Sequence, residues 1–182
     1  MGIDTARAAA IEVEARTLAQ PPALPASPAE LFLQIRRCLV SAFDEEILRT
    51  PVHGIFSLLK IDEEQRTDGT AVWVILGGAT FDKGQDGSEF FYRRDGARIS
   101  FVVIVMYANG TLALLAYRFH LQFPAGINPA YVRFDLNPEP SDDALLEPRC
   151  HIHAGAEMLR VAAPLMGPVE ILDKLLYGMP IP

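Results

Sequence analysis

Residues 99–117 read ISFVVIVMYANGTLALLAY, and this stretch decides the fold of the chain. It is almost wholly apolar, as a membrane-spanning helix would be, but Asn109 and Gly110 interrupt it in the middle. An Asn-Gly pair between two apolar runs is the strongest local signal for a two-residue β-turn. About nine residues on each side is strand length, whereas a helix that crosses a bilayer needs about 20 uninterrupted apolar residues. The stretch therefore predicts a buried β-hairpin and no membrane span.

The sequence on either side of this hairpin predicts helices at both ends of an α+β fold. Ser27-Pro28-Ala29-Glu30 is a capping box with proline at the first helical position, and the apolar residues after it recur at helical spacing until Thr50-Pro51. Gly167-Pro168 opens a second helix, which Gly178 ends. Three further segments predict strands, namely residues 71–79, 131–136 and 149–153. We expect a mainly antiparallel sheet with a central Asn-Gly hairpin, packed by an N-terminal and a C-terminal helix.

The chain of 182 residues divides into a short arm and one domain. Residues 1–26 begin with helix-favouring sequence and end in a proline-rich segment, so they predict a helical arm with a linker. Residues 27–182 predict a single α+β domain. The first 20 residues lack the apolar run of a signal peptide, and Cys38 and Cys150 are too sparse for a disulfide framework. A cytoplasmic protein is expected.

The charge and the hydrophobicity of the chain exclude some classes of partner and favour others. A formal net charge of −7 argues against a general nucleic-acid coat, which works through a basic surface, although a local basic pocket is compatible with it. Half of the residues are hydrophobic, which is high for a protein of this size and favours an interface with a partner or a homo-oligomer.

Three of the predicted strands each carry a polar pair at i, i+2 among apolar residues. The pairs are Arg118 and His120, Arg133 and Asp135, and His151 and His153, and Arg149 extends the last of them. Because alternate side chains of a strand share a face, the two members of a pair point the same way. If the three strands are neighbours, the pairs converge into one cationic, histidine-bearing cleft.

The hairpin turn also predicts which residues lie opposite each other. With Asn109-Gly110 as a two-residue loop, Phe101 is expected opposite Arg118 and Ile99 opposite His120. The polar pair then lies at the end of the hairpin that is far from the turn.

A cleft of this composition suits phosphodiester cleavage without a metal ion. Histidine titrates near neutrality, so His120, His151 and His153 are the expected proton-transfer groups. The guanidinium fork matches phosphate oxygens, so Arg118, Arg133 and Arg149 are the expected substrate-binding residues, and Asp135 is expected to orient a histidine. We therefore expect a metal-independent phosphodiesterase or ribonuclease that needs no cofactor and acts on RNA or a nucleotide.

Two other interpretations use the same residues. Polar pairs at i, i+2 occur in any sheet with one solvated face, and the chain is then a non-enzymatic module for protein interaction or oligomerisation. Alternatively, His151 and His153 present two imidazoles to one side of a strand and bind a metal ion, with His120 or Asp135 as a further ligand.

The order of these motifs resembles the TumE family of small prokaryotic toxin–antitoxin proteins. The resemblance rests on Tyr117-Arg118-Phe119-His120, Val132-Arg133-Phe134-Asp135, His151-x-His153 and Pro168-x-Glu170-x-Leu172, in roughly the C-terminal third of the chain. Residue type and order carry it rather than one long motif. The resemblance implies a toxin–antitoxin or defence role, a cognate antitoxin or other protein partner, and action on nucleic acid.

Overall fold

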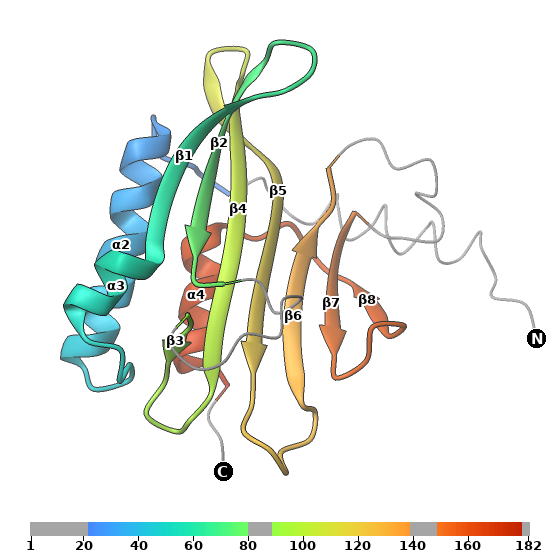
Figure 1. Ribbon diagram of the computed structural model, residues 1–182. Coiled ribbons are helices and arrows are strands. Elements are labelled where there is room, and N and C mark those ends of the chain that lie inside the picture. Colours follow the sequence, from blue (N-terminus) through green and yellow to red (C-terminus); the bar gives the residue numbers. More distant parts are fainter. Residues whose placement is uncertain (1–21, 80–88, 139–148, 180–182) are drawn as a thin grey trace, which may run out of the picture.

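Figure 1 shows a computed structural model of the protein, which describes residues 22–79, 89–138 and 149–179. Eight strands of these residues form one antiparallel sheet in the order β1-β2-β4-β5-β6-β7-β8, and β3 pairs with β4 beside this path. The strands are β1 (Leu59–Gln65), β2 (Ala71–Gly77), β3 (Phe91–Tyr92), β4 (Arg98–Ala108), β5 (Thr111–Gln122), β6 (Tyr131–Leu136), β7 (Cys150–Ala154) and β8 (Arg160–Ala162). The helices of the same residues are α2 (Pro28–Asp44), α3 (Val52–Leu58) and α4 (Pro168–Tyr177). The α+β class with a mainly antiparallel sheet is confirmed.

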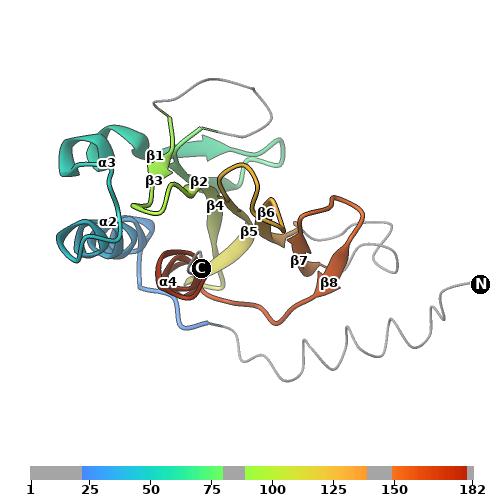
Figure 2. The ribbon, with the colours of Figure 1, turned by 90° about the horizontal axis from the view of Figure 1, so that it is seen from below.

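Helices α2 and α4 lie together on one face of the sheet, and Figure 2 shows them below the strands. The Ser27 side chain caps α2 by accepting a hydrogen bond from the main-chain nitrogen of Glu30, as the capping box predicts. Apolar residues of both helices pack against inward side chains of β4, β5 and β6. The core between the layers includes Leu31, Ile35, Leu39, Ile171, Leu172, Leu175, Phe101, Phe119, Leu121 and Phe134. On the other face of the sheet, which Figure 1 shows from the front, none of the three helices in the described residues packs over β4 to β7.

The long central strands β4 and β5 pair antiparallel, with Ala108 opposite Thr111. Asn109 and Gly110 connect them, and both have positive φ, which these two residue types tolerate best. The expected register further along is wrong by one residue, because Val102 pairs with Arg118 and Ser100 pairs with His120.

A β-bulge causes this difference. Ile104 pairs with Ala116 and Val105 pairs with Leu114, so Leu115 is an extra residue in β5. Ile99 and Phe101 therefore point into the core, on the face opposite to Arg118.

The predicted N-terminal helix is too long. Helix α2 ends at Asp44, and Glu46 adopts a positive φ that turns the chain out of the helix. The apolar residues that follow serve other elements, as Leu48 forms an isolated β-bridge with Arg93. Helix α3, β1 and the short strands β3 and β8 were not predicted. Their apolar residues recur neither at the spacing of a helix nor with the alternation of a strand.

The expected C-terminal helix and the strand at residues 131–136 are confirmed at their predicted bounds. The expected helical arm covers residues 1–26, of which 1–21 lie outside the described residues. In the described part of the chain, no helix has the length and apolarity that crossing a membrane requires.

Candidate metal centre

The strand register brings the three polar pairs onto one face of the sheet. Asp135 of β6 pairs with Arg118 of β5 on one side and with His151 of β7 on the other. Arg133 likewise pairs with His120 and with His153. Directly paired residues project to the same face, so the six side chains form an array two residues deep and three strands wide. This face is opposite to the one on which α2 and α4 pack.

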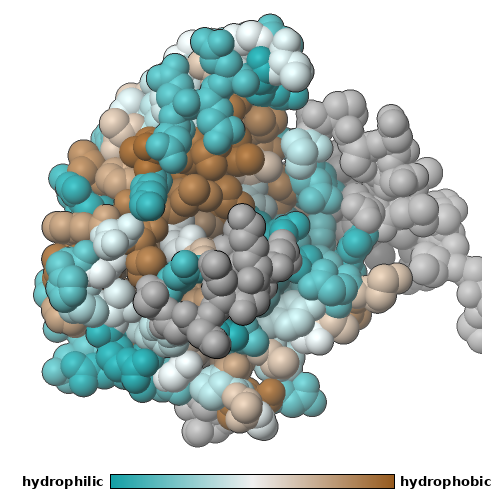
Figure 3. All heavy atoms as spheres, viewed as in Figure 1, coloured by the Kyte–Doolittle hydropathy of each residue, from teal (hydrophilic) through white to brown (hydrophobic). Residues whose placement is uncertain are grey.

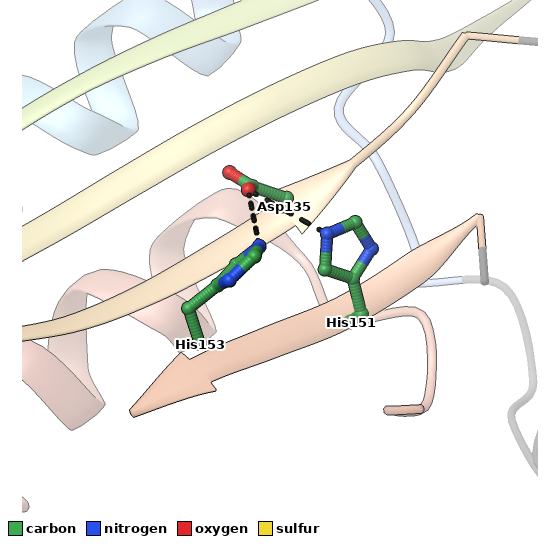
Figure 4. A group of neighbouring side chains, drawn as sticks. All are labelled: Asp135, His151 and His153. Atoms are coloured by element: carbon green, nitrogen blue, oxygen red, sulfur yellow. Dashed lines mark ion pairs between the residues drawn. The ribbon is translucent and has the colours of Figure 1, made fainter. Parts of the chain in front are cut away.

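Three members of this array are deeply buried and close together. Asp135, His151 and His153 are 4%, 2% and 1% exposed. The Oδ2 atom of Asp135 lies 3.3 Å from Nε2 of His153 and 3.7 Å from Nε2 of His151. Figure 4 shows both rings rising from β7 towards the carboxylate. One ligand atom from each of the three residues fits within 4.8 Å of the others.

The turn after β7 fixes the orientation of one of these rings. The Nδ1 atom of His153 lies 3.4 Å from the main-chain oxygen of Ala156. A carbonyl oxygen only accepts, so Nδ1 is the donor in this contact, and in a neutral ring Nε2 then carries the lone pair. Gly155 has φ +74, and its α-hydrogen faces Pro129 so closely that a Cβ would lie 2.9 Å from the proline Cβ. Glycine therefore permits the tight turn that places Ala156 beside the ring.

Arg133 holds the carboxylate from its other side. Its Nε donates to Oδ2 of Asp135 at 2.8 Å, and its two terminal nitrogens donate to the carboxylate oxygens of Glu157 at 2.7 and 2.9 Å. Tyr131 also donates to Glu157, at 3.1 Å. The hydrogen bonds from Arg133 lower the pKa of Glu157, so this carboxylate stays ionised beside the arginine.

Arg118 lies at the solvent side of the array. Its Nε is 3.5 Å from Oδ1 of Asp135, and its side chain is 53% exposed. Asp135 thus has each carboxylate oxygen beside a different arginine. Its Oδ1 accepts no hydrogen bond from the described residues, although it is buried.

His120 lies on the same face but outside the group of three possible ligands. Burial, followed by the positive charge of Arg133, lowers its pKa to about 4, so the ring is neutral at neutral pH. Its ring centroid is 5.0 Å from that of Tyr131. The structure therefore places Asp135, rather than His120, with His151 and His153.

Arg149, the remaining predicted substrate-binding residue, precedes β7 and donates to the main-chain oxygen of Asn137. Glu157, which the sequence analysis did not select, belongs to the site because it pairs with Arg133. Its signal in the sequence is the spacing His151-x-His153-xxx-Glu157, which places an acidic residue just after the glycine turn that follows the histidine strand.

Two of the three separations between the donor atoms fit a divalent transition-metal ion. Ligands about 2.0–2.2 Å from a tetrahedral zinc ion are about 3.3–3.6 Å from one another, close to the two distances from Asp135 Oδ2. Two imidazoles and one carboxylate are a ligand set of catalytic zinc sites and of non-haem iron sites. The contacts of His153 with Ala156 and of Asp135 with Arg133 are the outer interactions that orient metal ligands.

Comparison with known proteins found no relative of this chain. No protein-family model matches the chain, and no curated protein or solved structure matches it. The candidate function therefore rests on the site itself.

Proposed function

We propose that the protein binds a divalent transition-metal ion, such as Zn²⁺, through Asp135, His151 and His153. The observation that carries this proposal is the pair of distances, 3.3 and 3.7 Å, between one buried carboxylate oxygen and two imidazole nitrogens. All three residues are less than 5% exposed. Three protein ligands leave a position for water or substrate, so the bound ion would supply Lewis-acid chemistry.

A purely structural ion-pair cluster accounts less well for the same geometry. The ring proton of His153 lies on Nδ1 when this atom bonds to Ala156, so a neutral ring offers Asp135 only a lone pair. The 3.7 Å between His151 Nε2 and Asp135 Oδ2 exceeds normal hydrogen-bond length. A buried carboxylate facing two imidazole nitrogens at these distances is stabilised by a cation that all three share.

Zinc binding by the purified full chain tests the proposal. After chelation and removal of the chelator, isothermal titration with Zn²⁺ should show one site per chain. Asp135→Asn and His151→Gln should each weaken binding by at least 100-fold. His53→Gln is the matched control, because His53 is an exposed histidine on α3 far along the chain from the site. Binding that both site variants retain, or no zinc binding by folded protein, would overturn the proposal.

A second candidate function is the cleavage or binding of a phosphate-bearing substrate such as RNA, in a toxin–antitoxin or defence role. The shared face of Arg118, His120 and Arg133 supports it, since it gathers cations and an imidazole from separate strands. The burial of His151 and His153 supports it less, because a proton-transfer group must reach the substrate. RNA cleavage in excess chelator that Arg118→Gln and His120→Gln abolish would favour this candidate. Cleavage that needs added Zn²⁺ and intact Asp135 would join it to the metal centre instead.

A further inference from the structure

A small cavity adjoins the proposed metal centre on the face of the sheet opposite to α2 and α4. It has a volume of about 170 Å³ and lies over β4, β5 and the end of β6. Its wall includes Val102, Ile104, Ala116, Arg118, Asp135 and Asn137. Typical sites for drug-sized ligands measure about 300–1,000 Å³, so this cavity suits a much smaller molecule.

One side of the cavity is apolar. Val102 and Ile104 lie two residues apart on β4, so they share a face of the sheet, and they pair with Leu76 and Val74 of β2. All four are partly exposed, and Figure 3 shows apolar residues gathered over β2 and β4 on this face. An aliphatic group in the cavity would be removed from water against Val102 and Ile104.

The opposite side of the cavity is polar and centres on two paired residues. Arg118 and Asp135 lie directly opposite each other on β5 and β6, and both line the cavity. The half-exposed guanidinium of Arg118 carries five N–H donors, of which Nε faces Asp135 at 3.5 Å. A planar fork of this kind matches a carboxylate, which it can bind through two parallel hydrogen bonds.

The charges around the cavity favour an anion once a metal ion is present. Asp135 alone would repel an anion, but Arg133 already donates to its Oδ2 atom. A divalent ion held by this carboxylate and two neutral imidazoles adds a net positive charge beside the cavity. A bound anion and the metal ion should therefore strengthen each other's binding.

We propose that this cavity binds a small organic monocarboxylate, with the carboxylate on Arg118 and its short aliphatic part against Val102 and Ile104. The inference rests on the proposed metal site for its location next to the ion. A small monocarboxylate is the class of substrate or co-ligand expected beside the metal ion, because the cavity is small and largely apolar and its lining includes the half-exposed guanidinium of Arg118.

Titration of the full chain with butyrate tests this inference, and butyramide serves as the uncharged probe of the same shape. Zinc-loaded protein should bind butyrate at least ten-fold more tightly than butyramide, as measured by shifts in two-dimensional NMR spectra. Arg118→Gln should remove this preference while still binding one Zn²⁺, since it keeps all three ligands. Arg66→Gln is the matched control, because Arg66 is exposed in the turn between β1 and β2.

The outcomes separate the two proposals. Equal binding of the two probes, or butyrate binding that Arg118→Gln leaves unchanged, would overturn the carboxylate site even if zinc binds. Butyrate binding that depends on Arg118 in protein unable to bind Zn²⁺ would support the carboxylate site and overturn the metal centre.

Discussion

The Nδ1 atom of His153 lies 3.4 Å from the main-chain oxygen of Ala156, so a neutral ring that donates to this oxygen carries its proton on the side that faces away from Asp135. A ring held in this tautomer is prepared to bind a metal ion through Nε2 without further rearrangement.

Long-range ¹H–¹⁵N NMR spectra of the histidine rings check this tautomer. In metal-free protein, His153 should show the pattern of a ring protonated at Nδ1. Added Zn²⁺ should shift its Nε2 resonance while the Nδ1 proton stays in place. The exposed His53 provides the reference, since it lies far along the chain from the site and its resonances should not move when Zn²⁺ is added. An Nε2-protonated His153 that ignores Zn²⁺ would contradict the assignment.

His120 should make the protein less stable as the pH falls below about 6.5. Burial and Arg133 lower its pKa to about 4 in the folded state, whereas an unfolded histidine titrates near its ordinary value of 6.5. Between these values only the unfolded chain takes up the proton, so the free energy of unfolding declines with falling pH. The expected loss from this residue is about 2 kcal/mol at pH 4.5.

Urea unfolding at pH 7.0 and pH 4.5, with chelator present, measures this loss. His120→Gln cannot titrate, so the difference in stability between the two pH values should be smaller in this variant by the amount stated. Identical pH dependence in both proteins would mean that His120 is protonated in the folded state as readily as in the unfolded chain.

Gly77→Ala should destabilise the fold by about 2–3 kcal/mol through overpacking. A Cβ at this position would lie 2.2 Å from Cζ of Phe101, whose ring covers the glycine from the neighbouring strand. The same ring stacks on Phe119 with centroids 5.1 Å apart, so it has little freedom to move.

Two comparisons isolate this effect in chemical denaturation. A Cβ at Gly69 would meet no atom within 4 Å, but this residue has φ +80. Gly69→Ala should therefore lower the free energy of unfolding only by the backbone strain, about 1 kcal/mol. Phe101→Leu should reduce the cost of Gly77→Ala in the double variant, because the shorter side chain makes room. Strict additivity of the two changes would show that the ring is not the cause.

Cys38 should react slowly with alkylating reagents although it is only partly buried. Burial first, and then the hydrogen bond to Asp173 at 3.3 Å, raise the pKa of its thiol to about 12. At pH 7.5 the reactive thiolate is therefore roughly 1,000-fold scarcer than in a thiol at its ordinary pKa. Iodoacetamide labelling followed by peptide mass spectrometry measures the rate. Asp173→Asn should accelerate labelling, and a native rate equal to that of the chain in urea would refute the expectation.

The sequence was most informative where a single local rule decides the structure. The capping box at Ser27 and the glycine stop at Gly178 set helix ends that the structure reproduces. The alternation of polar and apolar residues in β6 and β7 was enough to predict which side chains share a face. These rules need no knowledge of distant parts of the chain.

The rest depended on long-range structure. No local signal marks Leu115 as the extra residue of a bulge, so the register beyond it could not be predicted from the turn. The joining of β5 to β6 and of β6 to β7 decides that Asp135 lies between the other strands and meets both imidazoles. The choice of Asp135 over His120 as the neighbour of His151 and His153 follows from that pairing and not from residue type.

The extra residue in β5 has a consequence for how this strand can change during evolution. Side chains alternate with a period of two, and Leu115 shifts the phase of every residue that follows it in the strand. Loss of that one residue would drive Arg118 and His120 inward among the aromatic rings and push Phe119 into water. An insertion or deletion of two residues in β5 would keep each side chain on its present face, whereas a change of one residue would not. The odd extra residue therefore keeps the apolar side chains in the core and the charged array on the other face.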